Sequence, residues 1–312
     1  MLYQPSGTAG TARRREGAAR GESRPPPMAA AAPRHNARDM GTAGSVPERT
    51  TIPAPLAVGA VVVGLTAMPL VAVTALPHGL RLVLVVSELV LVAPGLLALA
   101  AYRVPMRSVL GRWPLDRRTA ALMMAAGASL WLASLGLLEL QYALWSPSPE
   151  YLEAFRRLHE ALRPKGALDA LLSVAAIAVI PALCEETLVR GIVLPSLLRV
   201  AGPVGAVVIS AVVFAVIHLD PYRTVFTLVL GLALGLLRVR TGSLVACIVA
   251  HAALNALTFA VVPFADDPSQ GLPDPRPALG LGMLLAGSAA TWVVLRFLPS
   301  LTPPGTPPRL GT

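Results

Sequence analysis

The chain has 312 residues, of which 54% are hydrophobic and 14% are charged, and its mean hydropathy is +0.65. Soluble domains carry about a quarter charged residues, so this composition excludes an ordinary water-soluble globular protein. The net charge of +9 could indicate a nucleic-acid partner, but the arginines lie in an N-terminal segment and short loops without interleaved aromatic residues, which excludes nucleic acid. Several runs of about 20 apolar residues can each cross about 30 Å of hydrocarbon. We therefore predict an all-α membrane protein whose surroundings are the lipid bilayer.

The sequence divides into three parts. Residues 1–50 are rich in Arg, Pro and Ala and have no apolar periodicity, so this segment cannot bury enough surface to offset its ordering entropy and is predicted to be a disordered tail. Residues 51–299 are predicted to form a polytopic transmembrane domain, with its motif-bearing core at 167–262. Residues 300–312 are a Pro-rich C-terminal tail.

The transmembrane domain is predicted to be a bundle of about eight helices. The fourth continues into a Glu-Glu segment, and the fifth and sixth are short enough to be tilted or to lie inside the bundle. The predicted spans are Pro55–Leu76, Leu82–Tyr102, Thr119–Leu140, Ala167–Leu183, Pro203–His218, Thr224–Leu237, Leu244–Val262 and Ala278–Leu298.

Loop arginines predict the orientation of this bundle. The N-terminal tail, the loop 103–118 and the pair Arg238 and Arg240 fall on one side if there are eight spans, and arginine-rich loops favour the cytoplasm. The opposite side receives the acidic loop 266–274 and the segment Tyr151–Leu162, which is predicted to be a short amphipathic helix at the interface. We expect an integral membrane protein of a bacterial inner membrane with both termini in the cytoplasm.

Ionisable residues inside the membrane are costly and mark a functional site by default. Glu88 and Glu139 match no motif: Glu88 is interpreted as a hydrogen-bond acceptor or part of a water cavity and is left outside the site, and Glu139 is expected to reach the interface. The others belong to three short motifs. These are Glu185-Glu186-Thr-Leu-Val-Arg190, Phe214-x-x-x-His218 and His251-x-x-x-Asn255.

The first motif predicts an ion pair and a free carboxylate. Glu186 and Arg190 are four residues apart on one helix, with the acid N-terminal to the base, which is the favourable order. Glu185 then lies on a different face without a local partner. A desolvated carboxylate is suited to act as a general base toward water.

The other two motifs predict supporting groups. His218 lies on another span and could share the activation of water. His251 and Asn255 are four residues apart and share one helix face, where their donors could hold a tetrahedral oxyanion.

The segments CEETLVRG, FAVIH and HAALN resemble the three motifs of the CPBP family, the CAAX-protease and bacteriocin-processing intramembrane proteases, which include the type II CAAX prenyl endopeptidases. The resemblance covers about residues 167–262 closely, and every required motif position is present. It implies that 51–299 is a protease domain with an eight-span core, and that the protein is an endopeptidase acting on a membrane-embedded or lipid-modified, CAAX-type peptide.

The resemblance also implies a role for each motif residue. Glu185 matches the glutamate that activates the attacking water, and His218 matches the histidine that assists it. Glu186 and Arg190 match the supporting pair that organises the site.

His251 and Asn255 match the residues proposed to hold the oxyanion, and Phe214 matches the apolar anchor beside the second-motif histidine.

Two alternatives of a different kind stay open: a non-catalytic scaffold of the same fold, and a transporter whose ionisable cluster relays protons.

A zinc ion is possible, although no cofactor is favoured. Catalytic zinc takes three protein ligands and a water, and Glu185, His218 and His251 would be the ligands. Against zinc, the chain has no H-E-x-x-H motif, and a zinc site would leave Asn255 without a role. The metal-free mechanism is the preferred interpretation.

Overall fold

The computed structural model describes residues 50–112, 116–261 and 274–298. The chain divides into residues 1–46 and 47–312, and every described residue belongs to the second unit. The predicted tails lie outside the described residues, apart from Thr50, as do most of the acidic loop 266–274 and the final residue of the predicted seventh span, Val262.

The described part of unit 47–312 consists of helices joined by short connections, with no strand among the described residues, which confirms the predicted fold class. Its helices before the first motif are α1 (Ala54–Ala75), the short η1 (Leu76–His78), α2 (Leu80–Ala101), α3 (Met106–Leu110), α4 (Arg117–Leu144) and α5 (Pro149–Leu162). One continuous helical run follows, made of α6 (Ala167–Val174), η2 (Ala175–Val179), α7 (Ile180–Glu186), η3 (Thr187–Val193) and α8 (Leu194–Val216). The last helices are α9 (Thr224–Thr241), α10 (Leu244–Val261) and α11 (Pro277–Phe297).

Seven helical segments among the described residues are long and apolar enough to cross a membrane, close to the predicted eight. The count is seven and not eight because one helical segment, Ala167–Val216, is 50 residues long. At 1.5 Å per residue such a run measures about 75 Å, more than twice the hydrocarbon thickness. Gly202 breaks it with a φ of 66° and a ψ of 178°, so the run supplies the two predicted crossings on either side of Gly202.

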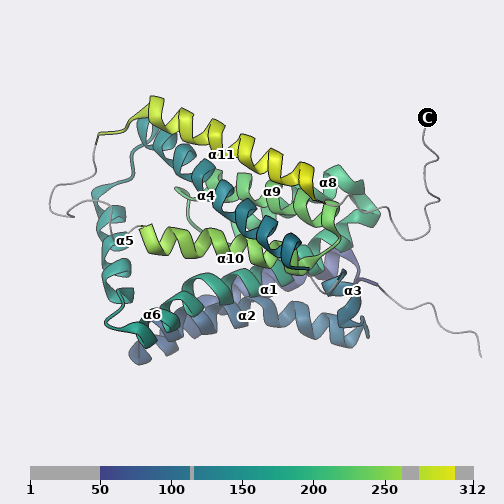
Figure 1. Ribbon diagram of the computed structural model, residues 1–312. Coiled ribbons are helices and arrows are strands. Elements are labelled where there is room, and N and C mark those ends of the chain that lie inside the picture. The colour runs from purple at the N-terminus through teal and green to yellow at the C-terminus, as the bar shows by residue number, and fades with distance from the viewer. Residues whose placement is uncertain (1–49, 113–115, 262–273, 299–312) are drawn as a thin grey trace, which may run out of the picture. The chain divides into compact units, whose positions relative to one another are not determined.

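The helix that carries the third motif lies in the middle of the helical assembly. In Figure 1, α10 lies between α4 on one side and the run from α6 to η3 on the other, and it contacts α4, η2 and α7. The contact with α4 is close because Gly127 has no side chain: a Cβ there would collide with the carbonyl oxygen of Ala250, the residue before His251. Small residues are what allow membrane helices to approach one another this closely.

The two ends of the bundle differ in character. At one end, Arg238 in the last turn of α9 donates to the carbonyl oxygens of Val109, Leu110 and Gly242, and Gly111 forms a β-bridge with Ser243. These contacts place the loop after α2 on the same side as the α9–α10 junction, as the arginine distribution predicts. Arg238 and Arg240 lie inside α9, however, and not in the loop where the sequence suggested them.

The opposite end carries α5, which runs across the long helices (Figure 1). Its N-cap is Ser148, whose hydroxyl accepts a hydrogen bond from the backbone N–H of Tyr151. Polar and apolar residues segregate strongly along the helix, as the sequence predicts. Glu153, Arg156 and Glu160 form ion pairs along its polar side.

Candidate active site

The first motif begins in α7, which lies between two wider, π-helical turns, η2 and η3, and it ends at Arg190 within η3. Each is followed by a proline near the start of the next segment, Pro181 in α7 and Pro195 in α8. Proline lacks an N–H and its ring crowds the preceding turn, so a wider turn relieves the clash. Such turns are frequent at functional sites. Both motif glutamates are buried here.

Glu186 and Arg190 form the predicted ion pair. Arg190 Nη1 donates to Glu186 Oε1 at 2.8 Å, and both side chains are fully buried. The second terminal nitrogen, Nη2, donates to the carbonyl oxygen of Gly231 on α9 at 3.0 Å. Gly231 packs against Ala211 of α8, where a Cβ would come within 2.9 Å of the Ala211 Cα. The pair therefore joins the first motif to the packed α8–α9 unit.

Phe214 is the apolar centre of the site. Its buried ring contacts the imidazole of His218 at a centroid distance of 5.0 Å and that of His251 at 5.6 Å, both edge to face. The guanidinium of Arg190 lies over the ring, 4.2 Å from its centroid. One side chain therefore contacts the guanidinium of the ion pair and both imidazole rings.

Glu185 faces both histidines. Its Oε2 lies 3.9 Å from His218 Nε2 and 4.0 Å from His251 Nε2, and it has no hydrogen-bond partner. The other ring nitrogens are engaged: His218 Nδ1 lies 2.8 Å from the carbonyl oxygen of Phe214, and His251 Nδ1 lies 3.0 Å from Glu186 Oε1. Because these oxygens only accept, each Nδ1 carries the hydrogen, and in a neutral ring Nε2 presents its lone pair toward Glu185.

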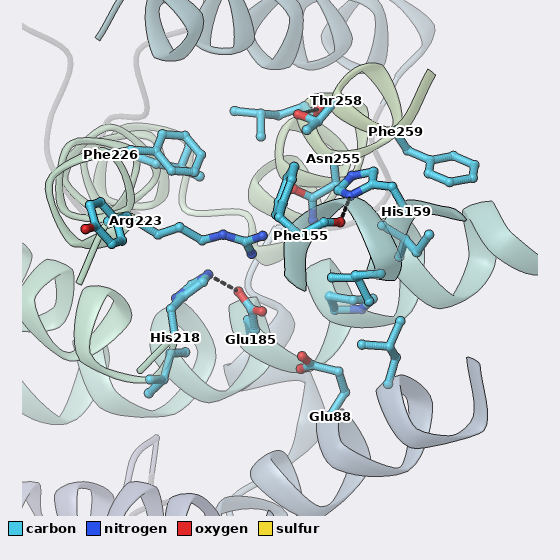
Figure 2. A pocket seen from close by; sticks show the side chains of 18 of the residues that line it. Glu88, Phe155, His159, Glu185, His218, Arg223, Phe226, Asn255, Thr258 and Phe259 are labelled. Atoms are coloured by element: carbon cyan, nitrogen blue, oxygen red, sulfur yellow. Dashed lines mark hydrogen bonds and ion pairs between the residues drawn. The ribbon is translucent and has the colours of Figure 1, made fainter. Parts of the chain in front are cut away.

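These groups line a cavity of about 620 Å³ between the membrane helices. Glu185, His218, His251 and Asn255 all face it, so the structure brings the three motifs to one space. Figure 2 shows the carboxylate of Glu185 directed toward His218. The gap of about 4 Å between Glu185 and each histidine is bridged more readily by a water molecule than by a direct bond.

The amphipathic helix α5 forms one wall of the cavity with the apolar side chains Leu152, Phe155 and Leu158. It is fastened to the turn after His218, because the hydroxyl of Tyr151 donates to Asp220 Oδ2 at 2.8 Å. Burial and then this hydrogen bond raise the pKa of the Tyr151 phenol to about 12. The phenol therefore stays protonated and keeps donating across the physiological pH range.

The candidate zinc ligands do not have the spacing of a zinc site. Two ligands at about 2.0–2.1 Å from a tetrahedral zinc lie about 3.4 Å apart, whereas Glu185 Oε2 is 3.9 and 4.0 Å from the two imidazole nitrogens. Within the described ranges, no group of three or more His, Cys, Asp or Glu side chains is arranged to hold a metal ion. Cys184 and Cys247 are both buried with free thiols.

Residues 167–257, just under a third of the chain, match the family model described as type II CAAX prenyl endopeptidase Rce1-like. The matched segment contains all three motifs. The chain contains an Rce1-like domain. Over these residues, the match confirms the resemblance to the CPBP family. Searches of curated proteins and of solved structures gave no match.

The sequence motifs do not include every polar residue of the cavity. Glu88 on α2, Trp131 on α4 and Arg223 before α9 also line it. Glu88 Oε2 and Trp131 Nε1 are buried without a hydrogen-bond partner. For Glu88, the sequence contained a usable signal, because a carboxylate in the middle of an apolar span marks a functional site by default. Trp131 and Arg223 carried no such signal.

Proposed function

We propose that this protein is an intramembrane endopeptidase that hydrolyses a peptide bond of a membrane-embedded or lipid-modified, CAAX-type substrate. The observation that carries the proposal is the unpartnered Oε2 of Glu185, which faces two imidazole nitrogens in a cavity between membrane helices. The Rce1-like match supports the reaction class. The mostly apolar cavity suits a substrate with a large apolar group.

In the proposed reaction, a water molecule lies between Glu185 and His218. Glu185 takes a proton from this water as its oxygen adds to the substrate carbonyl carbon, and His218 orients the water through its Nε2 lone pair. The carbonyl oxygen becomes an oxyanion. We assign its stabilisation to the side-chain N–H of Asn255, beside His251, whose ring Glu186 holds at Nδ1.

The cleavage assay uses an internally quenched peptide that ends in a farnesylated cysteine and three further residues. The purified protein in lipid nanodiscs should release the C-terminal tripeptide, and the same peptide without the farnesyl group serves as a control for lipid recognition. No metal is required in this mechanism, so activity should survive a chelator. Loss of activity to the chelator, followed by recovery with added zinc, would reverse that part of the proposal.

Asn255→Ala should lower kcat by about 10²–10³-fold, which corresponds to about 2.7–4 kcal/mol of barrier, because one oxyanion donor is removed. The KM should change little, since the donor acts on charge that develops after binding. Steady-state kinetics on the quenched peptide measure both constants. A kcat within threefold of the wild type would remove Asn255 from the oxyanion site.

We propose that the end of the bundle with Arg112 and Arg238 faces a bacterial cytoplasm, with both termini on that side, so that α5 faces the opposite compartment. A cysteine introduced at the exposed Glu160 of α5 should then react with a membrane-impermeant maleimide on intact cells, whereas one at the exposed Arg112 should react only after permeabilisation. The reverse pattern would invert the orientation.

A further inference from the structure

Glu88 shares a helix face with the residues that pack against the first motif. Gly95 lies seven residues later, two helical turns along α2, and a Cβ there would meet side-chain atoms of Leu188 and Ile192 in η3. At the start of α2, Arg81 pairs with Asp169 of α6. These two contacts show that α2 runs parallel to the α6–η3 segment, and Glu88 lies between them.

This packing directs Glu88 into the catalytic cavity. Figure 2 shows its carboxyl group and that of Glu185 turned toward the same space. The Oε2 atom of Glu88 and the Oε2 atom of Glu185 are both buried, and neither has a hydrogen-bond partner. Two carboxyl groups that point into one apolar cavity cannot both be ionised at low cost, so one of the two should stay protonated.

Among the described residues, no cation around the cavity is free to offset a second negative charge on Glu88 and Glu185. Arg190 is neutralised by Glu186, and both histidines use Nδ1–H toward other acceptors, so their Nε2 atoms accept toward Glu185. Arg223 pairs with Asp220. The titratable or charged groups that face Glu88 or line the same cavity are Cys184 and Glu185 on α7, together with Tyr142, Tyr151, His159, His218, Tyr222, Arg223 and His251.

Peptide hydrolysis needs such a proton. Glu185, as the base, receives a proton from water, and the tetrahedral intermediate collapses only when the leaving nitrogen is protonated, because an amide anion is a very poor leaving group. Before the reaction, Glu185, His218 and His251 all offer acceptors, and the first step leaves a proton on Glu185. A protonated carboxyl at Glu88, on another helix, would be a second donor for the leaving nitrogen.

We propose that Glu88 is the general acid of the reaction, an inference that rests on the proposed function. The oxyanion re-forms the C=O bond, the C–N bond breaks, and the nitrogen takes the proton of the Glu88 carboxyl. The products are a carboxylic acid and an amine. The proton that Glu185 took from water then passes to Glu88 through cavity water, which restores both groups.

The decisive comparison uses two versions of the farnesylated peptide, one with the scissile amide and one with a thioester in its place. A thiolate leaves without protonation, whereas an amine does not. Glu88→Gln should lower kcat on the amide by about 10²–10³-fold and leave thioester turnover within about threefold, while Glu88→Asp recovers part of the amide activity. Glu185→Gln should lose both reactions, because both need activated water.

Glu139→Gln is the matched control, since Glu139 is also a carboxylate of a membrane helix but binds the backbone N–H of Arg276 and does not line the cavity. It should leave both reactions unchanged. An equal loss on amide and thioester in Glu88→Gln would show a structural role and overturn the proposal, as would wild-type amide turnover.

A second measurement does not depend on turnover. Infrared spectra at neutral pH should show the C=O stretch of a protonated carboxyl group, and Glu88→Gln should remove it while Glu139→Gln keeps it. If the wild type cleaved neither the amide nor the thioester peptide, the proposed function would fail for this substrate. The infrared spectrum would then still decide whether Glu88 holds the proton. A spectrum unchanged in Glu88→Gln would overturn the inference.

Discussion

Glu185→Gln is expected to lower kcat on the farnesylated peptide by about 10⁴-fold, the upper end of the contribution of a general base. The amide has nearly the volume of the carboxylate, so the packing around α7 is kept, but it cannot take a proton from water. The measurement is the rate of tripeptide release by purified protein in nanodiscs, together with the thermal unfolding midpoint, which should match the wild type.

The same variant tests the function in its native surroundings. Peptide termini in host membranes that carry the wild type are compared with those that carry Glu185→Gln, and Glu139→Gln again serves as the control. Termini that depend on Glu185 would identify the substrates. Identical profiles under several growth conditions, together with no tripeptide release by the wild type in vitro, would favour a scaffold or a proton-relaying transporter instead.

Arg190→Met is expected to destabilise the folded protein by about 3–5 kcal/mol, because it leaves the fully buried carboxylate of Glu186 without its countercharge. It also removes the hydrogen bond to the carbonyl oxygen of Gly231 and the contact over the Phe214 ring. The expected readouts are a lower yield of assembled protein and a lower unfolding midpoint in detergent.

The double variant Glu186→Gln with Arg190→Met separates charge from packing. Without a buried charge, it should recover most of the lost stability. Its activity should stay low, because the amide that replaces the Glu186 carboxylate no longer offers a negative charge to His251 Nδ1. An Arg190→Met protein with the wild-type unfolding midpoint would contradict the buried-pair account.

The sequence predicted the membrane helices because the cost of burying backbone and charge in lipid acts on every span separately. The runs at 55–76 and 82–102 correspond to α1 and α2 within two residues at each end. The i, i+4 spacing likewise predicted the Glu186–Arg190 pair, since that contact needs only one helix. The amphipathic pattern of Tyr151–Leu162 predicted α5, although not its position along the cavity.

The contacts between helices depended on tertiary packing. No spacing relates Glu185 to the histidines at 218 and 251, which reach it only because Phe214 packs between them and Gly127 lets α10 approach α4. Glu88 is the clearest case. Its sequence position marked it as costly, yet its place opposite Glu185 follows from Gly95 packing on η3, a contact between segments far apart in the sequence that local periodicity does not encode.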